Sequence, residues 1–194
     1  MKRFPHLRMP MSALLASVIL GCGAAYKGPP SDHFDGDRFF DASPDHTFGT
    51  RVKWLWEMKT VPWPKWIDDP RFPAPPERVF GKRLRCTYIN HATLLIQTDG
   101  LNILTDPIWS KRAGPVSWIG AVRIRRPGTS MADLPRIDVV LISHDHYDHL
   151  DIPSLKAISR RDRPIVLAGL GLEALLTKEG IAGANEMEWC SPLR

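Results

Sequence analysis

The fold of this chain is decided by the stretch Ile137-Asp138-Val139-Val140-Leu141-Ile142-Ser143-His144-Asp145-His146-Tyr147-Asp148-His149-Leu150-Asp151. Its first part is mostly apolar and β-branched, which predicts a buried strand over residues 137–142. Three histidines and three aspartates follow within residues 144–151, so they lie where a central strand ends. Such a concentration of ionisable groups indicates a functional site. The alternative is a solvated, histidine-rich loop that caps the next helix.

The spacing within this loop is typical of metal ligands. In an extended backbone, residues two apart point to the same side, so His144 and His146 can bind one cation together. Asp148 and His149 follow after the chain begins to turn and can face a second cation. Imidazole nitrogen and carboxylate oxygen suit zinc, and a site that keeps one position open for water is catalytic rather than structural. The loop therefore predicts a catalytic zinc site.

The pattern His-x-His-x-Asp-His resembles the signature of the metallo-β-lactamase superfamily. The longer stretch 143–151 is similar to the branch that contains N-acylphosphatidylethanolamine-hydrolysing phospholipase D and its bacterial relatives. The resemblance runs from about residue 83 to residue 170. It includes three further stretches: Asn90-His91-Ala92-Thr93, Leu104-Thr105-Asp106-Pro107, and Pro127-Gly128 before Asp133-Leu134-Pro135.

This resemblance implies an α/β fold, with residues 83–194 forming the N-terminal half of an αββα sandwich in which two sheets face each other between helices. It also implies two zinc ions, roughly 3.5–4 Å apart, that share a water and lower its pKa. A metal-bound hydroxide would then attack the substrate. His144 and His146 are expected on one ion, and Asp148 and His149 on the other, with Asp148 counted among the catalytic residues.

Two residues outside the signature are also candidates for the site. Asp106 matches an aspartate that supports the family's site from beside the metal, and such a carboxylate fixes the tautomer and tilt of a ligating imidazole. We therefore predict a catalytic role for Asp106, against the alternative of a turn former before Pro107. His91 resembles the family's Gly-His-Ala-Thr histidine, although Asn90 stands where glycine is usual. A hydrogen-bonded core histidine explains His91 equally well.

A loop rich in glycine, proline and arginine spans residues 107–134 and is expected to face the same strand ends. Its basic residues are predicted to bind a substrate phosphate, and the alternative is a solvated basic face. The predicted substrate-binding residues are Arg123, Arg125 and Arg126, with Lys111 and Arg112 in the same cluster.

Turn residues and hydrophobic periodicity predict the remaining elements. We expect strands at residues 84–90, 93–98, 102–105 and 163–168, with a hairpin turn at 98–100. Helices are expected at 48–60, from the cap residue Asp151 to about residue 160, and at 171–179, where Gly180 ends the helix. Strands that meander first and then alternate with helices fit one half of the predicted sandwich.

Residues 1–22 are predicted to be a signal peptide, because basic residues precede a short apolar run that ends in small residues. Ile19-Leu20-Gly21-Cys22 resembles a bacterial lipobox. Cys22 is therefore the predicted lipidation site, and the bacterial cell envelope, as a lipid-anchored outer-membrane or periplasmic protein, is the predicted location. Ordinary secretion and an uncleaved N-terminus are the alternatives. Three basic and no acidic residues precede Cys22, so the net charge of +5 falls to +2 without them, which argues against a nucleic-acid partner.

Residues 23–82 form a predicted extension that is rich in proline and tryptophan. We expect its tryptophans, namely Trp54, Trp56, Trp63 and Trp66, to clamp the extension onto the domain. The alternative is a lip for an acyl chain or a membrane surface. Cys86, within a predicted strand, is expected to be a buried thiol, and a bridge to Cys190 is the alternative.

The chain has no histidine after His149, whereas the family places further ligands in the second half of its domain. We therefore expect this chain to be the N-terminal part of a longer protein. The predicted function is zinc-dependent hydrolysis of phosphodiesters such as N-acylphosphatidylethanolamine, with a phospholipid or another small molecule as substrate. The alternatives are a lactonase or other carbonyl hydrolase, and an inactive, truncated lipoprotein fragment.

Overall fold

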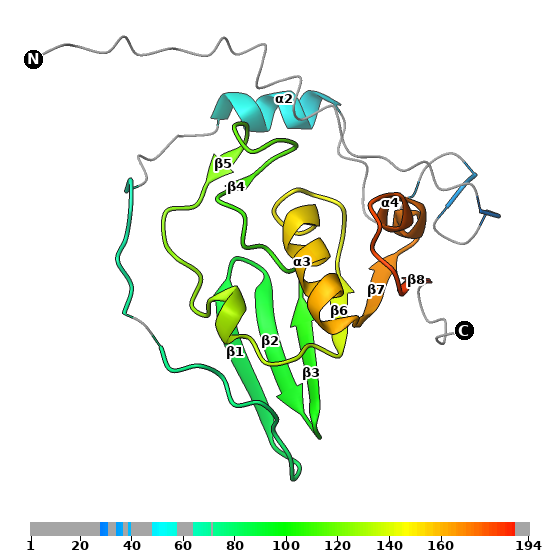
Figure 1. The fold of residues 1–194 in the computed structure, drawn as a ribbon. Helices are drawn as coiled ribbons and strands as arrows, with labels where there is room; N and C mark the ends of the chain where they lie inside the picture. The colour runs from blue at the N-terminus through cyan, green and yellow to red at the C-terminus, as the bar shows by residue number, and fades with distance from the viewer. Residues whose placement is uncertain are drawn as a thin grey trace, which may run out of the picture.

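A single six-stranded sheet forms the centre of the described structure, in the order β1-β2-β3-β6-β7-β8 (Figure 1). The computed structural model describes residues 28–30, 34–36, 39, 48–57, 64–70 and 72–188. Strands β1 to β3 pair antiparallel, whereas β3, β6, β7 and β8 run parallel. The strands are β1 Leu84–Asn90, β2 Thr93–Thr98, β3 Leu101–Thr105, β6 Val139–Ile142, β7 Ile165–Gly169 and β8 Ala184–Met187.

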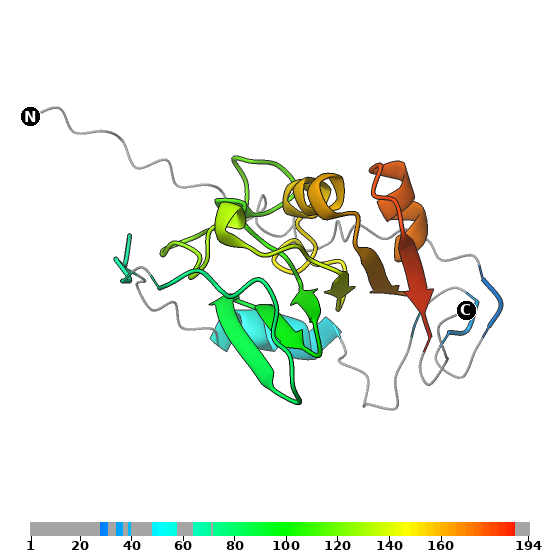
Figure 2. The same cartoon turned by 60° about the horizontal axis from the view of Figure 1, so that its bottom comes forward.

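Helices α3 and α4 lie on the same face of this sheet (Figures 1 and 2). Helix α3 spans Ile152–Asp162 and connects β6 to β7, and α4 spans Leu172–Lys178 and connects β7 to β8. The predicted α/β class is therefore confirmed. The smaller elements are helix α2 Phe48–Glu57, the two-stranded sheet β4 Arg112–Ala113 with β5 Ala121–Val122, and the short 3-10 helix Met131–Asp133.

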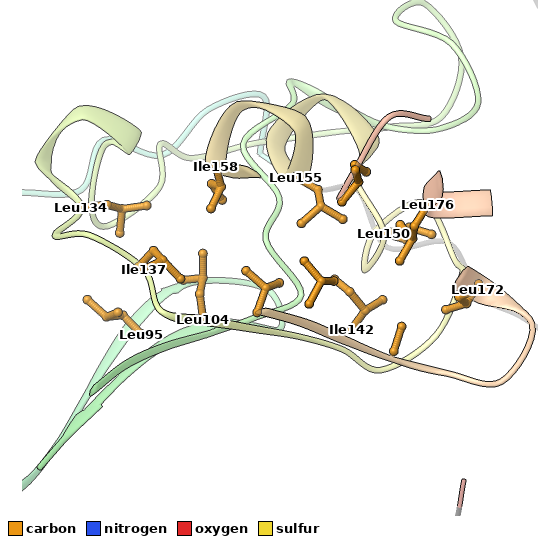
Figure 3. Close-up of a cluster of buried hydrophobic side chains, with 14 of the residues drawn as sticks. Leu95, Leu104, Leu134, Ile137, Ile142, Leu150, Leu155, Ile158, Leu172 and Leu176 are labelled. Atoms are coloured by element: carbon orange, nitrogen blue, oxygen red, sulfur yellow. The ribbon is translucent and has the colours of Figure 1, made fainter. Parts of the chain in front are cut away.

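The core lies between the sheet and these two helices, as Figure 3 shows. Alternate residues of the central strands point to one face, so Leu95, Leu104 and Val140 are completely buried there. Leu155 and Ile158 project from α3 toward them and are equally buried. Each such side chain contributes about 1.5–3 kcal/mol when it leaves water. This layer of side chains fixes the sheet against α3, and so fixes the loop that connects β6 to α3.

The opposite face of the sheet is apolar but only partly buried. It carries Ile96, Ile103 and Leu141, which are half-buried, and Tyr88, whose exposed fraction is 62%. Cys86 is paired with Ile96 on this face and is exposed, so the prediction of a buried thiol is wrong. The predicted sandwich assigns this face to a second sheet.

Residues 64–80 run along the domain and are joined to it by backbone groups. The Ile67 N–H donates to the Ile124 carbonyl at 2.7 Å, and the Gly100 N–H donates to the Val79 carbonyl at 2.8 Å. Trp56 is 89% exposed, so its side chain does not clamp the extension as predicted. Trp66 is 48% exposed and lines a cavity together with Trp109 of the domain, so its clamping role stays a prediction. The side chains of Trp54 and Trp63, like Cys22, Cys190 and the predicted signal peptide, lie outside the described residues.

Several element boundaries differ from the sequence predictions among the described residues. The strand predicted from residue 137 begins at Val139. Arg163 takes a left-handed conformation with φ of 52° and ends α3, so the next strand begins only at Ile165. Helix α2 is described from Phe48 to Glu57, and residues 58–60 of the predicted helix lie outside the described residues. Among the described residues, no helix has the length and apolar character needed to cross a membrane.

Candidate metal centre

Two neighbouring strands end at the same edge of the sheet and place Asp106 beside Ser143. Because β3 and β6 are parallel, their carboxyl ends coincide, and the Asp106 N–H donates to the Leu141 carbonyl at 2.9 Å. Asp106 adopts a left-handed φ of 36°, a conformation in which aspartate is one of the few tolerated side chains. This turn directs its carboxylate back toward the loop that follows β6.

The Asp106 carboxylate is buried, with 4% of the residue exposed, and accepts three hydrogen bonds. The Ser143 N–H donates to Oδ1 at 2.8 Å, and the Ser143 hydroxyl donates to Oδ2 at 2.7 Å. His149 Nδ1 lies 2.9 Å from the same Oδ2. An ionised carboxylate can only accept, so Nδ1 carries a proton, and in the neutral imidazole Nε2 then holds the lone pair. Asp106 makes the contact that its predicted supporting role requires.

The free Nε2 of His149 faces Asp148 and, unexpectedly, His91. Asp148 Oδ2 lies 3.8 Å from His149 Nε2 and 3.0 Å from His91 Nε2. One potential ligand atom from each of these three residues lies within 4.8 Å of the others. The His91 side chain is 53% exposed, so it is not a core histidine. The sequence left His91 open between the histidine of the family's Gly-His-Ala-Thr motif and a core histidine, and its exposure and its contact with Asp148 favour the first.

His144 and His146 lie beside this group and pack against one another. Their ring centroids are 4.5 Å apart, and the His144 and His149 centroids are 4.0 Å apart. Burial lowers the pKa of His144, and the neighbouring imidazoles of His149 and His146 lower it further. A neutral imidazole is the form that binds metal. The structure thus places His144 and His146 beside His149, and the ligation of metal by the four signature residues, with its division between two ions, stays a prediction.

Asp151 holds the loop after Asp106 against the start of α3. It occupies the N-cap position as predicted, but its carboxylate makes no hydrogen bond to the helix backbone. It accepts instead from the Ser110 N–H at 3.0 Å, the Ser110 hydroxyl at 2.8 Å and the Trp109 N–H at 3.2 Å. The Ser154 hydroxyl is a further partner. Asp151 therefore joins the segments after β3 and β6 rather than capping the helix.

The three arginines predicted to bind substrate already have partners. Arg123 donates to the carbonyls of Ile108 and Ser110, and burial lowers its pKa. Arg125 lies 3.6 Å from Asp69, and Arg126 lies 3.1 Å from Asp68. A role in substrate binding stays a prediction. A cavity of about 610 Å³ nearby is lined by Lys65, Trp66, Trp109, Lys111, Val122, Arg123, Arg126 and Pro127.

The donor set fits a divalent metal ion. His149 offers one nitrogen whose tautomer is fixed by a buried carboxylate, which is the usual support of a ligating histidine. Asp148 adds a carboxylate oxygen. Its side chain is 43% exposed, so the site opens to solvent. Two imidazoles and one carboxylate are suitable ligands for zinc and for iron.

Residues 101–192 match the family model described as the beta-lactamase superfamily domain. An uncharacterized protein of Mycobacterium tuberculosis is 40% identical over 111 residues, which cover 56% of this chain and 30% of that protein. The N-acyl-phosphatidylethanolamine-hydrolyzing phospholipase D 1 of Caenorhabditis elegans is 38% identical over 112 residues, covering 55% of this chain and 32% of that enzyme. The chain therefore spans about a third of the length of these curated relatives.

Among solved structures, this chain is similar to Igni18, a metallo hydrolase of Ignicoccus hospitalis. The TM-score is 0.43 at 22% sequence identity, with 57% of this chain and 42% of that chain covered.

Proposed function

We propose that this chain, whose residues 101–192 belong to the beta-lactamase superfamily, is part of a zinc-dependent hydrolase that cleaves phosphodiesters such as N-acylphosphatidylethanolamine. The observation that carries the proposal is the convergence of His149 and Asp148 at the strand ends, with Asp106 fixing the histidine from behind. The similarity to the phospholipase D of C. elegans supports the substrate class.

The residues of the chain have distinct parts in this chemistry. A divalent cation, when bound, would polarise a phosphoryl oxygen and lower the pKa of a water. Asp106 keeps the proton of His149 on Nδ1, so that Nε2 stays available as a ligand. The exposed side of Asp148 leaves room for an anionic headgroup to approach from solvent. Electrostatic attraction of that headgroup needs cations, and we expect the cavity lined by Lys111 and Arg126 to supply them.

The same cavity supports a substrate with both a charged and an apolar part. Trp66 and Trp109 line it together with basic side chains. Indole rings favour the boundary between apolar and polar surroundings, where a phospholipid headgroup meets its acyl chains. Arg126 is bound to Asp68 at the exposed rim, so we expect it to exchange this weak surface pair for a substrate phosphate.

The activity is tested with a full-length protein that contains this chain, loaded with zinc and offered N-acylphosphatidylethanolamine in mixed micelles, with release of phosphatidic acid as the readout. We expect turnover that chelation abolishes and added zinc restores. His149→Ala should be inactive under the same conditions. Turnover that survives chelation contradicts the metal mechanism, and hydrolysis of lactones without hydrolysis of phosphodiesters contradicts the substrate class.

We also propose that the mature protein is attached to the cell envelope by a lipid on Cys22. The support is the arrangement of basic residues, apolar run and lipobox-like Ile-Leu-Gly-Cys in the sequence. Labelling cells with a fatty-acid analogue tests it, and we expect the wild-type chain, but not Cys22→Ala, to carry the label. Equal recovery of both variants in the soluble fraction contradicts the anchor.

A further inference from the structure

We propose that His91 is a metal ligand, so that His91, Asp148 and His149 together hold one divalent transition-metal ion. This inference rests on the proposed metal dependence and adds to the signature loop a ligand from a different part of the chain. The turn between β1 and β2 supplies His91, whereas the loop after β6 supplies Asp148 and His149. The centre would then be assembled by two segments from different parts of the sheet, with β3 between β2 and β6.

The spacing of the three donor atoms suits a single ion. Around a metal with bonds of about 2.0–2.2 Å, neighbouring ligand atoms of a tetrahedral site lie about 3.3–3.6 Å apart. The two contacts of Asp148 Oδ2 bracket this value, at 3.0 Å to His91 Nε2 and 3.8 Å to His149 Nε2. The three donor atoms all lie within 4.8 Å of one another, so rotation of exposed side chains is enough to close the set.

The turn that carries His91 is held to the segment that carries Asp106. Thr93 donates its hydroxyl proton to the Asp106 carbonyl at 2.6 Å, and the Asn90 amide donates to the Ile108 carbonyl at 3.0 Å. Both residues are buried. Asp106 in turn fixes His149, so the imidazoles of His91 and His149 are positioned by one rigid segment, residues 106–108.

Backbone strain at His91 is a second sign of function. His91 has φ of 38°, and Asp106, which lies across from it, has φ of 36°. A left-handed residue other than glycine costs about 1–3 kcal/mol and persists where the surrounding structure enforces it. The His91–Asp148 pair is about half exposed, and such surface pairs contribute little to stability. Stability alone therefore gives no reason for a histidine in this strained turn.

The competing role for His91 is that of a hydrogen-bond donor that only orients Asp148. Two substitutions separate the roles. His91→Gln keeps an amide donor near the position of Nε2 but is a poor ligand for zinc or cobalt, whereas His91→Ala removes both functions. Tyr88→Phe, on strand β1 just before the turn and 62% exposed, is the control for a change in β1 that leaves the site intact.

The experiment titrates the metal-free 194-residue chain with Co²⁺ and then with Zn²⁺ in competition with a chromophoric chelator, and counts imidazoles per zinc by X-ray absorption. We expect His91→Gln and His91→Ala both to weaken binding by at least about tenfold, since loss of even a supporting partner costs this much. The imidazole count at one equivalent of zinc should fall by one in His91→Gln. Thermal melting confirms that each variant is folded.

Each remaining outcome has a definite meaning. Wild-type affinity and an unchanged imidazole count in His91→Gln, with loss only in His91→Ala, would show that His91 merely orients Asp148. Wild-type affinity in both variants would overturn the inference as well. If instead His149→Ala binds metal as tightly as wild type, or the wild type binds none, the proposed metal-dependent function itself fails.

Discussion

An aspartate joins strands β3 and β6 at each end of this strand pair. The hydrogen-bond networks around the two aspartates differ in whether they leave a lone pair that could bind a ligand. At the amino end, Asp138 accepts from both nitrogens of the Arg78 guanidinium and, at 2.9 Å, from the Asn102 N–H. At the carboxyl end, Asp106 accepts from Ser143 and His149. Arg78 has no lone pair left to offer, whereas His149 keeps one on Nε2.

The amino-end network continues inward and pairs most of its groups with one another, although Gln97 Oε1 is buried without a hydrogen-bond partner. The Asn102 amide donates to the carbonyls of Glu77 and Arg136 at 3.0 and 2.7 Å, and its oxygen accepts from Gln97 at 2.9 Å. The carboxyl-end network instead leads outward to exposed Asp148 and His91. A polar cluster whose groups are paired with one another stabilises the fold, and one that ends on an available imidazole nitrogen is able to bind a ligand. Matched substitutions are therefore expected to lower metal affinity at the carboxyl end and stability at the amino end.

The largest effect is expected for His149→Ala at the carboxyl end. It removes a ligand nitrogen together with the partner of the Asp106 carboxylate, so zinc affinity should fall by at least about 100-fold. Competition with a zinc-sensitive dye measures this. Retention of wild-type affinity would place the metal elsewhere in the chain.

Asp106→Asn should have the next largest effect on metal binding. The amide group preserves the shape of the side chain, but its nitrogen cannot accept the proton of His149 Nδ1, so the imidazole loses its fixed orientation. We expect zinc affinity to fall by about 10- to 100-fold, the range measured for such supporting carboxylates. The same titration, with the extended X-ray absorption spectrum as a check on geometry, reports the loss. An unchanged affinity would separate Asp106 from the metal site.

Asp138→Asn is the matched substitution at the amino end and should act on stability alone. Arg78 would keep its partly buried position without a carboxylate, at a cost of about 1.5–3 kcal/mol in the free energy of unfolding. Urea denaturation measures this cost, and zinc affinity should stay within about twofold of wild type. A large drop in zinc affinity would mean that the two ends of the strands are coupled.

The smallest predicted effect concerns acid stability. Burial raises the pKa of Asp138, but hydrogen bonds from Arg78 and from the Asn102 backbone outweigh it, and the net pKa lies below the ordinary value of 3.8. The contribution of the ionised carboxylate is therefore complete above pH 3.8 and is lost as the pH falls through the lower, folded-state pKa. Between pH 2 and 5, the free energy of unfolding should fall more steeply with falling pH in wild type than in Asp138→Asn. The same pH dependence in both proteins would contradict this.

Local patterns in the sequence were sufficient to predict the central strand and the aspartate beside the signature loop. The run from Val139 to Ile142 is apolar enough to require a buried strand, and the parallel strand ends bring Asp106 to the signature loop. The sequence did not decide whether His91 is a site histidine or a core histidine, because its place depends on the turn between two strands whose register the sequence does not specify. The face of β1 that carries Cys86 is likewise set by pairing with β2, which is why its exposure was predicted wrongly.

The structural role of Arg78 is a similar case. It lies in a proline-rich stretch that looked irregular, and its partner Asp138 is 60 residues away. The predicted tryptophan clamp was wrong for Trp56, whose side chain is exposed, and backbone hydrogen bonds of Ile67 and Val79 join this stretch to the domain.

Anomalous diffraction from crystals of the chain soaked in zinc tests the central claim most directly. The account predicts a zinc peak within bonding distance of His149 Nε2 and Asp148, with His91 drawn in as the third ligand and Asp106 still bound to His149 Nδ1. Crystals that show no peak at the carboxyl ends of β3 and β6, or a peak bound by other residues, would contradict it.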